Sequence, residues 1–235
     1  MTHLFDLAEA SLGIAFSPQA RERFDKYCKA LLETNKVMNL TAITEPEQVY
    51  LKHFIDSAAP LTADDLKNKK IIDVGCGAGF PGLPIKISEP SVSLTLLDSL
   101  GKRISFLSSL IGELGLEDVT CIHARAEEEA LKPDMREQFD FAVSRAVASL
   151  PMLCELCLPF VKVGGSFIAM KAQGYEEELE QAKSAINILG AEVHEIKEYS
   201  IPKSDIRHVL ITIKKISGTP SNYPRRFAKI QKKPL

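Results

Sequence analysis

A cluster of glycines that follows a short apolar run is the strongest chemical signal in this 235-residue chain. The run covers residues 71–74, and the glycines after it are Gly75, Gly77, Gly79 and Gly82. Glycine lets the backbone turn sharply, and it lets a ligand approach the main chain because no Cβ blocks the way. Asp98 ends the next apolar run, where a carboxylate can accept hydrogen bonds from a ribose diol. These residues predict a nucleoside-binding site.

The glycine loop fits two classes of cofactor site, depending on the register in which it is read. Gly77, Gly79 and Gly82 match the spacing of a dinucleotide-binding loop, with Asp98 as its ribose acid. Gly75, Gly77 and Gly79 match the loop of S-adenosylmethionine (SAM) methyltransferases. The glycines alone therefore leave both an NAD(P) oxidoreductase and a methyltransferase open.

Residues around the loop favour SAM. Pro81 and Pro84 remove backbone N–H donors at the start of the next helix. A pyrophosphate needs such donors, and SAM has no phosphate. Asp73 at the strand end is placed to reach a cationic ammonium group, and Glu127 after the third strand is placed to bind an adenine amino group. We predict a SAM site and keep an NAD(P) oxidoreductase as the alternative.

Two regions with different periodicity must position these residues. The first 65 residues carry apolar side chains at helical spacing, with Ser17 as an N-cap before Pro18. Thr44 is expected to open a capping box, followed by a helix that ends near Ala59. We predict an N-terminal helical extension over residues 1–65, a methyltransferase domain over 66–217 and a basic tail over 218–235.

From residue 66 onward, apolar runs alternate with helix-like stretches, which predicts an α/β domain with a mostly parallel sheet. The runs expected to be strands cover residues 71–74, 91–97, 119–122, 141–143 and 166–170, and the helices cover 83–88, 102–114, 150–158 and 175–189. Two final runs, 193–199 and 208–214, have no helix between them and predict an antiparallel hairpin at the sheet edge.

Charge and cysteine usage limit the function classes. The chain has 29 Lys and Arg against 31 Asp and Glu, so it is not a general polycation. The tail holds five of the basic residues and no acid, which predicts an anionic partner or a solvated tail. Five cysteines indicate a reducing compartment, and Cys154 and Cys157 are interpreted as packing residues. No metal site is expected, and the lack of a long apolar run or signal peptide predicts a cytoplasmic protein with no membrane partner.

Longer motifs resemble the glucose-inhibited division protein B family along nearly the whole chain. The most specific motifs are the glycine loop with its prolines, the string 97–103 (LDSLGKR) and Ser144-Arg145-Ala146. Shorter matches lie at 39–41, 53–57, 125–128 and 223–226.

The resemblance implies a bacterial class I SAM-dependent methyltransferase with a seven-stranded, Rossmann-like sheet. It further implies that the enzyme methylates guanine N7 in 16S ribosomal RNA, within the small ribosomal subunit or an assembly intermediate. By matching motif, the SAM site would include Gly75, Phe80, Ala126, Glu127 and Arg145. Gly77, Gly79 and Asp98 join it on the physical argument above.

Methylation of guanine N7 needs no general base, because N7 carries an in-plane lone pair and no proton. Catalysis would rest on positioning and electrostatics. Arg145 and Arg125 follow the fourth and third expected strands and are the catalytic candidates, although Arg125 could instead pair with neighbouring acids. His53 and Asp56 are interpreted as a fold contact on one helix.

The candidates for RNA contact are Lys171, Arg225 and Arg226. Removal of residues 218–235 is expected to weaken RNA binding and leave SAM affinity intact. A non-catalytic RNA-binding or ribosome-assembly factor on the same fold remains a further alternative.

Overall fold

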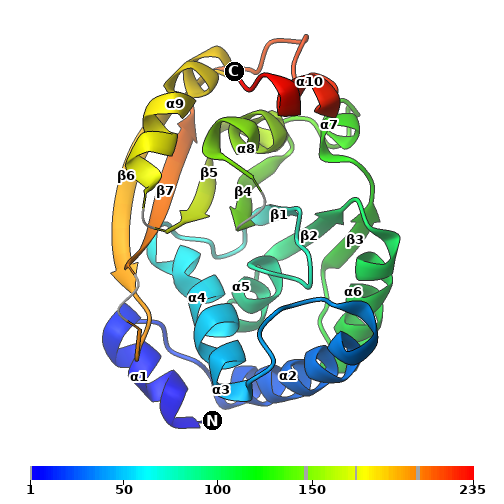
Figure 1. Cartoon of the computed structure of the whole chain (residues 1–235), viewed down its shortest axis with the longest axis vertical. Helices are drawn as coiled ribbons and strands as arrows, with labels where there is room; N and C mark the ends of the chain where they lie inside the picture. The colour runs from blue at the N-terminus through cyan, green and yellow to red at the C-terminus, as the bar shows by residue number, and fades with distance from the viewer. Residues whose placement is uncertain (1, 146–147, 173, 205–206) are drawn as a thin grey trace.

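A computed structural model describes residues 2–145, 148–172, 174–204 and 207–235, and it is built on one seven-stranded sheet (Figure 1). The strand order is β3-β2-β1-β4-β5-β7-β6; β1 to β5 run parallel, and β7 pairs antiparallel with both β5 and β6. The strands are β1 (Lys70–Val74), β2 (Ser93–Asp98), β3 (Val119–His123), β4 (Phe139–Arg145), β5 (Val161–Lys171), β6 (Ala191–Ser200) and β7 (Arg207–Lys215). The predicted sheet and its terminal hairpin are confirmed. Ala146 of the third motif lies outside the described residues.

Helices cover both faces of the sheet. Successive residues of a buried strand point to opposite faces and are apolar on both, so each face needs a covering layer. Ile71 packs with α5 (Gly82–Ser88), α6 (Gly101–Leu114) and the N-terminal helices. Ile72 packs with α8 (Leu150–Cys157), α9 (Tyr175–Ile188) and α10 (Phe227–Lys232). Among the described residues, no helix is long and apolar enough to cross a membrane.

The N-terminal helices follow the sequence pattern with one exception. Ser17 caps α2 (Pro18–Met38) by accepting a hydrogen bond from the N–H of Ala20, as predicted. The capping box at Thr44 is wrong, because Glu45 is the N-cap of α3 (Pro46–Val49) and makes no side-chain cap bond. The remaining helices are α1 (Thr2–Leu12), the π-helix η1 (Tyr50–Ile55), α4 (Asp56–Ala58), α7 (Ala126–Glu129) and the 3-10 helices η2 (Ala59–Thr62) and η3 (Leu158–Phe160).

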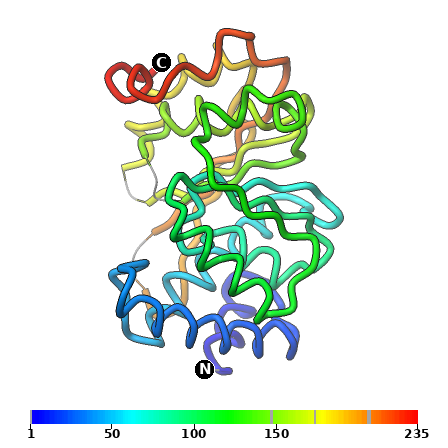
Figure 2. Tube along the Cα trace, turned by 90° about the vertical axis from the view of Figure 1, so that its right-hand side faces the viewer, coloured from blue at the N-terminus to red at the C-terminus, as the bar shows by residue number. Residues whose placement is uncertain are grey.

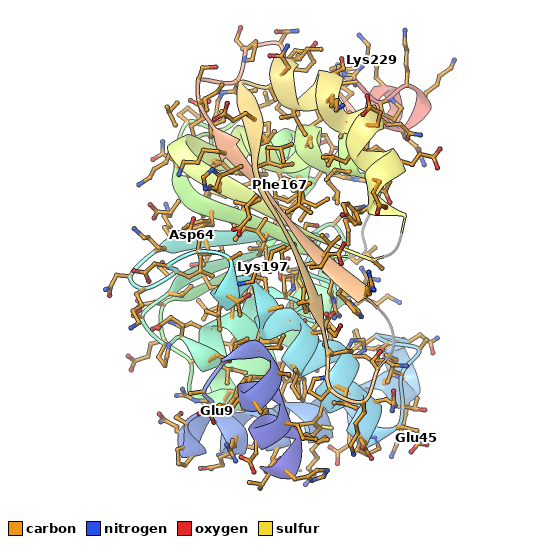
Figure 3. The ribbon with its side chains drawn as sticks, turned by 90° about the vertical axis from the view of Figure 1, so that its left-hand side faces the viewer. Glu9, Glu45, Asp64, Phe167, Lys197 and Lys229 are labelled. Carbon is orange, nitrogen blue, oxygen red and sulfur yellow. The ribbon has the colours of Figure 1, made fainter. Side chains whose placement is uncertain are left out.

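The N-terminal helices share a core with the sheet and hold the glycine loop. The rings of Phe24 and Tyr27 on α2 each lie 4.9 Å from the ring of Phe54, and Tyr27 stacks on Phe80 in the loop. The Tyr27 hydroxyl donates to the carbonyl of Ala78, also in the loop. At the sheet edge, Lys197 of β6 donates to the carbonyl of Thr62 (Figure 3). The N-terminal region therefore positions the loop directly.

The C-terminal tail packs against the body, at the end of the molecule opposite the N-terminus (Figure 2). Arg225 forms a two-pronged ion pair with Glu155 of α8, with N···O distances of 2.8 and 2.6 Å. The Glu155 side chain is fully buried, and the backbone N–H of Arg225 also donates to it. Ile230 is fully buried in the same core. The solvated-tail alternative is wrong for this segment.

Breaking the Arg225–Glu155 pair is expected to destabilise the fold strongly. Arg225→Ala leaves the buried carboxylate without its partner, and such losses cost about 3–5 kcal/mol of unfolding free energy. Urea denaturation measures this cost. The control is Lys203→Ala, which removes an exposed ion pair to Glu47 and is expected to cost under about 1 kcal/mol. Equal effects of the two variants would contradict the structural role of the pair.

Candidate active site

The glycine loop is tied to the end of β2 and is open to a ligand at Gly77. The N–H groups of Gly75 and Cys76 both donate to the carbonyl of Leu97, at 2.8 and 3.2 Å. Gly77 has a φ of +58°, and a Cβ built there would meet no atom within 4 Å. Gly79 differs, because a Cβ there would lie 2.7 Å from the Tyr27 hydroxyl. We therefore correct the expected cofactor contact of Gly79 to a packing role beneath the loop.

Two cavities of about 410 and 140 Å³ meet at the carboxyl ends of β1 and β2. Both are lined by Gly75, Asp98 and Ser99, so they adjoin, and the two together are called the groove below. The larger cavity is also lined by Leu40, Thr41, His53, Cys76, Gly77, Ala78, Phe80, Arg103 and Arg145. The smaller cavity is also lined by Val74, Leu97, Ala124, Arg125, Ala126, Glu127, Leu153, Leu156 and Phe227. The groove brings together every predicted cofactor residue except Gly79 and Asp73.

Asp98 lies where the two cavities join. Its Oδ2 accepts a hydrogen bond from the N–H of Gly77 at 2.9 Å, and its Oδ1 accepts one from the N–H of Leu100 at 2.9 Å. Arg103 adds an ion pair at 3.3 Å. Each carboxylate oxygen has two lone-pair positions. Those of Oδ2 are taken by Gly77 and Arg103, so Oδ1 keeps one acceptor position for a hydroxyl of a bound diol.

The start of α5 offers no amide donors for a pyrophosphate. Pro81 and Pro84 have no N–H, and the N–H of Gly82 donates to Asp73 at 2.7 Å. The N–H of Leu83 donates to the carbonyl of Gly79. A phosphate at a helix N-terminus depends on free N–H groups there. This geometry argues against the dinucleotide alternative.

Asp73 lies beneath the loop and does not line the groove, which corrects its expected contact with an ammonium group. Its side chain is fully buried. One oxygen accepts the Gly82 N–H, and the other has no hydrogen-bond partner among the described residues. Burial raises the pKa of the Asp73 carboxyl to about 7. Asp73 therefore fixes the turn into α5.

Arg145 at the end of β4 is held by the N-terminal helical segment. It donates to Asp56 at 3.0 Å, to the carbonyl of Lys52 at 2.8 Å and to Nδ1 of His53 at 3.0 Å. In the π-helical turn η1, the N–H of Asp56 donates to the carbonyls of Leu51 and His53 and not to that of Lys52. The Lys52 carbonyl accepts from Arg145. Arg145 therefore joins His53 and Asp56, for which the sequence predicts only a mutual contact.

His53 is kept neutral inside this cluster. Burial and the neighbouring Arg145 guanidinium lower the pKa of His53 to about 4. Its ring stacks on Phe80 with centroids 4.6 Å apart, and Arg145 lies over the same ring. Its Nε2 lies 2.7 Å from the Thr41 hydroxyl. Both ring nitrogens are thus occupied.

Asp56 also binds two residues that sequence reasoning missed. It accepts hydrogen bonds from the Tyr199 hydroxyl at 2.7 Å and from Nδ1 of His208 at 3.1 Å. Burial alone would raise the pKa of Asp56, but the bonds from His208 and Arg145 outweigh it and lower that pKa. Tyr199 and His208 lie far from Asp56 in the sequence, and no local pattern links them.

Arg125 and the C-terminal helix close the smaller cavity. The Arg125 guanidinium lies 5.4 Å from the ring centroid of Phe227, at the start of α10. Within the described part of the chain, Arg125 makes no ion pair with the acids of α7, so the alternative of local pairing is not seen. Phe227 is not among the predicted site residues, because the charge of the tail and its 223–226 motif point only to RNA contact.

The three predicted RNA contacts lie in different environments. Lys171 donates to the carbonyl of Ala148 and to Glu178, each at 2.7 Å, and Arg225 is bound to Glu155. Both cations are occupied inside the protein, which corrects their assignment to RNA. Arg226 is exposed, as are Lys229, Lys232 and Lys233 (Figure 3 labels Lys229). The described residues hold no group of three or more His, Cys, Asp or Glu side chains able to hold a metal.

The raised pKa of Asp73 predicts a pH-dependent contribution to stability. The folded chain keeps a proton that the unfolded chain, with an ordinary Asp pKa of 3.8, releases. The stabilisation is therefore complete below about pH 4 and is lost as the pH rises through about 7. We expect the unfolding free energy of the wild type, relative to Asp73→Asn, to fall over this range. Urea denaturation across the range measures the difference, and a constant difference would exclude Asp73 as the titrating group.

Comparisons with known proteins agree with this site. The family model described as rRNA small subunit methyltransferase G (GidB) matches residues 20–210. The ribosomal RNA small subunit methyltransferase G of Acetivibrio thermocellus is 50% identical over 228 residues, covering 96% of this chain and 93% of the relative.

Two solved structures show the same fold at low identity. TrmN from Thermus thermophilus is 15% identical, with a TM-score of 0.53 over 69% of this chain and 48% of its own. M. jannaschii TYW2, solved in complex with AdoMet, is 16% identical, with a TM-score of 0.50 over 64% of this chain and 70% of its own. The resemblance found in the motifs is confirmed: the chain belongs to the rRNA small subunit methyltransferase G family and has the class I methyltransferase fold.

Proposed function

We propose that this chain transfers a methyl group from SAM to N7 of one guanine in the 16S RNA of the small ribosomal subunit. The observation that carries the proposal is the pair of adjoining cavities, with Glu127 in one, Arg145 in the other and Asp98 in both. Its shape and polarity suit a nucleoside with an amino-acid tail, and the start of α5 does not suit a pyrophosphate. Family membership supports the same reaction. Ribosomal RNA as substrate fits the expected cytoplasmic location.

The groove residues favour one orientation of SAM, with its adenine in the smaller cavity and its methionine end in the larger one. Asp98 would receive the ribose diol, and Ala126 and Glu127 would hold the adenine against Phe227. Gly75, Gly77, Phe80 and Arg145 would then surround the methionine end, in the larger cavity. Bound SAM supplies an activated methyl group on a sulfonium. The AdoMet in the TYW2 crystal structure supports this choice of cofactor on the shared fold.

The protein residues then act by positioning. His53 is neutral with both nitrogens occupied, so it is not a general base, and guanine N7 requires none. Asp56 offsets the charge of Arg145, so the fixed guanidinium shapes the methionine end without adding a strong net positive charge. Arg125 presents an exposed guanidinium at the other end of the groove, where a phosphate can bind it.

The three predicted segments take different parts in this proposal. Residues 1–65 supply the rim of the larger cavity through Thr41 and His53. Residues 66–217 carry the groove. Residues 218–235 close the smaller cavity with Phe227 and present the exposed cations of α10. Of the three predicted RNA contacts, Arg226 stays in the proposal.

Methyl transfer from labelled SAM to small ribosomal subunits from cells lacking this protein tests the proposal. Nuclease digestion and mass spectrometry locate the product, which we expect to be N7-methylguanosine at a single site. Transfer to no subunit and to no stripped 16S RNA, with SAM binding intact, would instead favour the non-catalytic RNA-binding alternative.

The exposed cations of α10 are expected to contribute a salt-sensitive part of RNA affinity. Changing Arg226, Lys229, Lys232 and Lys233 to Gln should weaken RNA binding and leave the SAM Kd unchanged. The slope of log affinity against log salt should fall by about 0.7–0.9 for each phosphate that the variant no longer neutralises. Lys67→Gln with Lys69→Gln is the matched control, because these residues precede the amino end of β1. Equal decreases in both variants would contradict a specific role for α10.

Phe227 is expected to contact the cofactor. This revises the expectation that removal of residues 218–235 leaves SAM affinity intact. Phe227→Ala removes apolar surface from the smaller cavity and should raise the SAM Kd about tenfold, or about 1.4 kcal/mol. This is slightly below the ~1.5–3 kcal/mol of a fully buried Phe side chain, because Phe227 is only half-buried. Phe227→Leu keeps most of that surface and should lose less. Calorimetry gives the Kd, and thermal unfolding checks the fold. An unchanged Kd in Phe227→Ala would exclude the smaller cavity as the adenine site.

A further inference from the structure

The direction of the hydrogen bonds around His53 is fixed by Arg145. The guanidinium has only donors and stays protonated, so Nδ1 of His53 must be the acceptor of the 3.0 Å bond. The ring proton of neutral His53 therefore lies on Nε2. The lowered pKa of His53 agrees with a neutral ring.

This tautomer determines what the Thr41 hydroxyl can do. The Nε2–H of His53 donates to Oγ1 of Thr41 at 2.7 Å, and the N–H of Ile43 donates to the same oxygen at 3.0 Å. A hydroxyl has two lone pairs and one proton, so both acceptor positions are filled. The remaining function of the hydroxyl is to donate.

Thr41 is held firmly in place and lines the larger cavity. The side-chain amide of Asn35 brackets it, accepting from the Thr41 N–H at 2.8 Å and donating to the Thr41 carbonyl at 2.9 Å. Its partner His53 stacks on Phe80, in the loop assigned to the methionine end of SAM. Thr41, whose hydroxyl is left only to donate, therefore lines the part of the groove where methyl transfer would occur.

We propose that the Thr41 hydroxyl donates to O6 of the target guanine and so determines base specificity, an inference that rests on the proposed function. Guanine presents N7 and O6 as two neighbouring acceptors, whereas adenine presents an amino donor beside N7. A donor-only hydroxyl matches the first edge and opposes the second. Arg145 and His53 are positioning residues in this arrangement, since they fix the polarity of the hydroxyl.

The test compares small subunits reconstituted with guanosine or 6-thioguanosine at the mapped target, because sulfur is a weak acceptor. Sulfur alters the reactivity of N7 equally for every variant. A difference between variants in the effect of sulfur on kcat/KM therefore reports the contact between the Thr41 hydroxyl and the atom at position 6. For each variant, the quantity compared is the fall in kcat/KM from guanosine to 6-thioguanosine. This fall should be about tenfold larger for the wild type and for Thr41→Ser than for Thr41→Val. Thr41→Val should lose about tenfold on guanosine, with an unchanged SAM Kd.

A second variant guards against misfolding of Thr41→Val. Thr41→Cys has the unbranched skeleton of Thr41→Ser with a weaker donor, so it should show a lower sensitivity to sulfur than Thr41→Ser. Sensitivity equal to that of the wild type in both variants overturns the proposal. So does a SAM Kd that rises by the same factor as kcat/KM falls, because the hydroxyl would then bind the cofactor. Absence of transfer by the wild type on guanosine would overturn the proposed function itself.

Discussion

The ion pair between Arg145 and Asp56 is the interaction on which the site depends. Asp56 is 4% exposed and lies where the N-terminal helical segment, β4 and β7 meet. A buried pair of this kind is weak evidence for stability, but removal of one partner leaves an uncompensated charge that costs about 3–5 kcal/mol. The pair therefore locks three separate parts of the chain in one arrangement. In that arrangement His53, Phe80 and Arg145 pack together as one wall of the larger cavity.

The electrostatic character of the groove follows from the same pair. A free guanidinium at the end of β4 would repel a sulfonium and a methylated, cationic base. Asp56 and its hydrogen bonds from Tyr199 and His208 set the charge of this corner near neutral. Arg125 and the basic residues of α10 are exposed cations that lack such a buried partner in the ranges that the structure describes, and they face solvent. The buried guanidinium of Arg145 thus differs from these cations in having its charge offset inside the protein.

Local patterns in the sequence were enough to predict the sheet and the loop. β1, β2 and β4 are buried on both faces, so they appear as short apolar runs. Gly75 and Gly77 follow β1, and Asp98 ends β2. The residues that were missed depend on long-range contacts. Tyr199, His208 and Phe227 reach the site from distant segments, and Lys171 and Arg225 carry charges whose partners cannot be read from their neighbours. Gly79 fits the loop pattern, yet its lack of a side chain serves contact with Tyr27 and not with a ligand.

The wall that Phe227 adds to the smaller cavity has a consequence for biosynthesis. The other residues of the groove lie between Leu40 and Leu156, so a ribosome makes all of them before it reaches α10. A nascent chain that already has β1 to β4 lacks one side of the groove, and Glu155 then has no guanidinium partner. Synthesis of the central strands and completion of the cavity wall by Phe227 are thus separate in time. The smaller cavity has all of its lining residues only when the last segment of this sequence has docked.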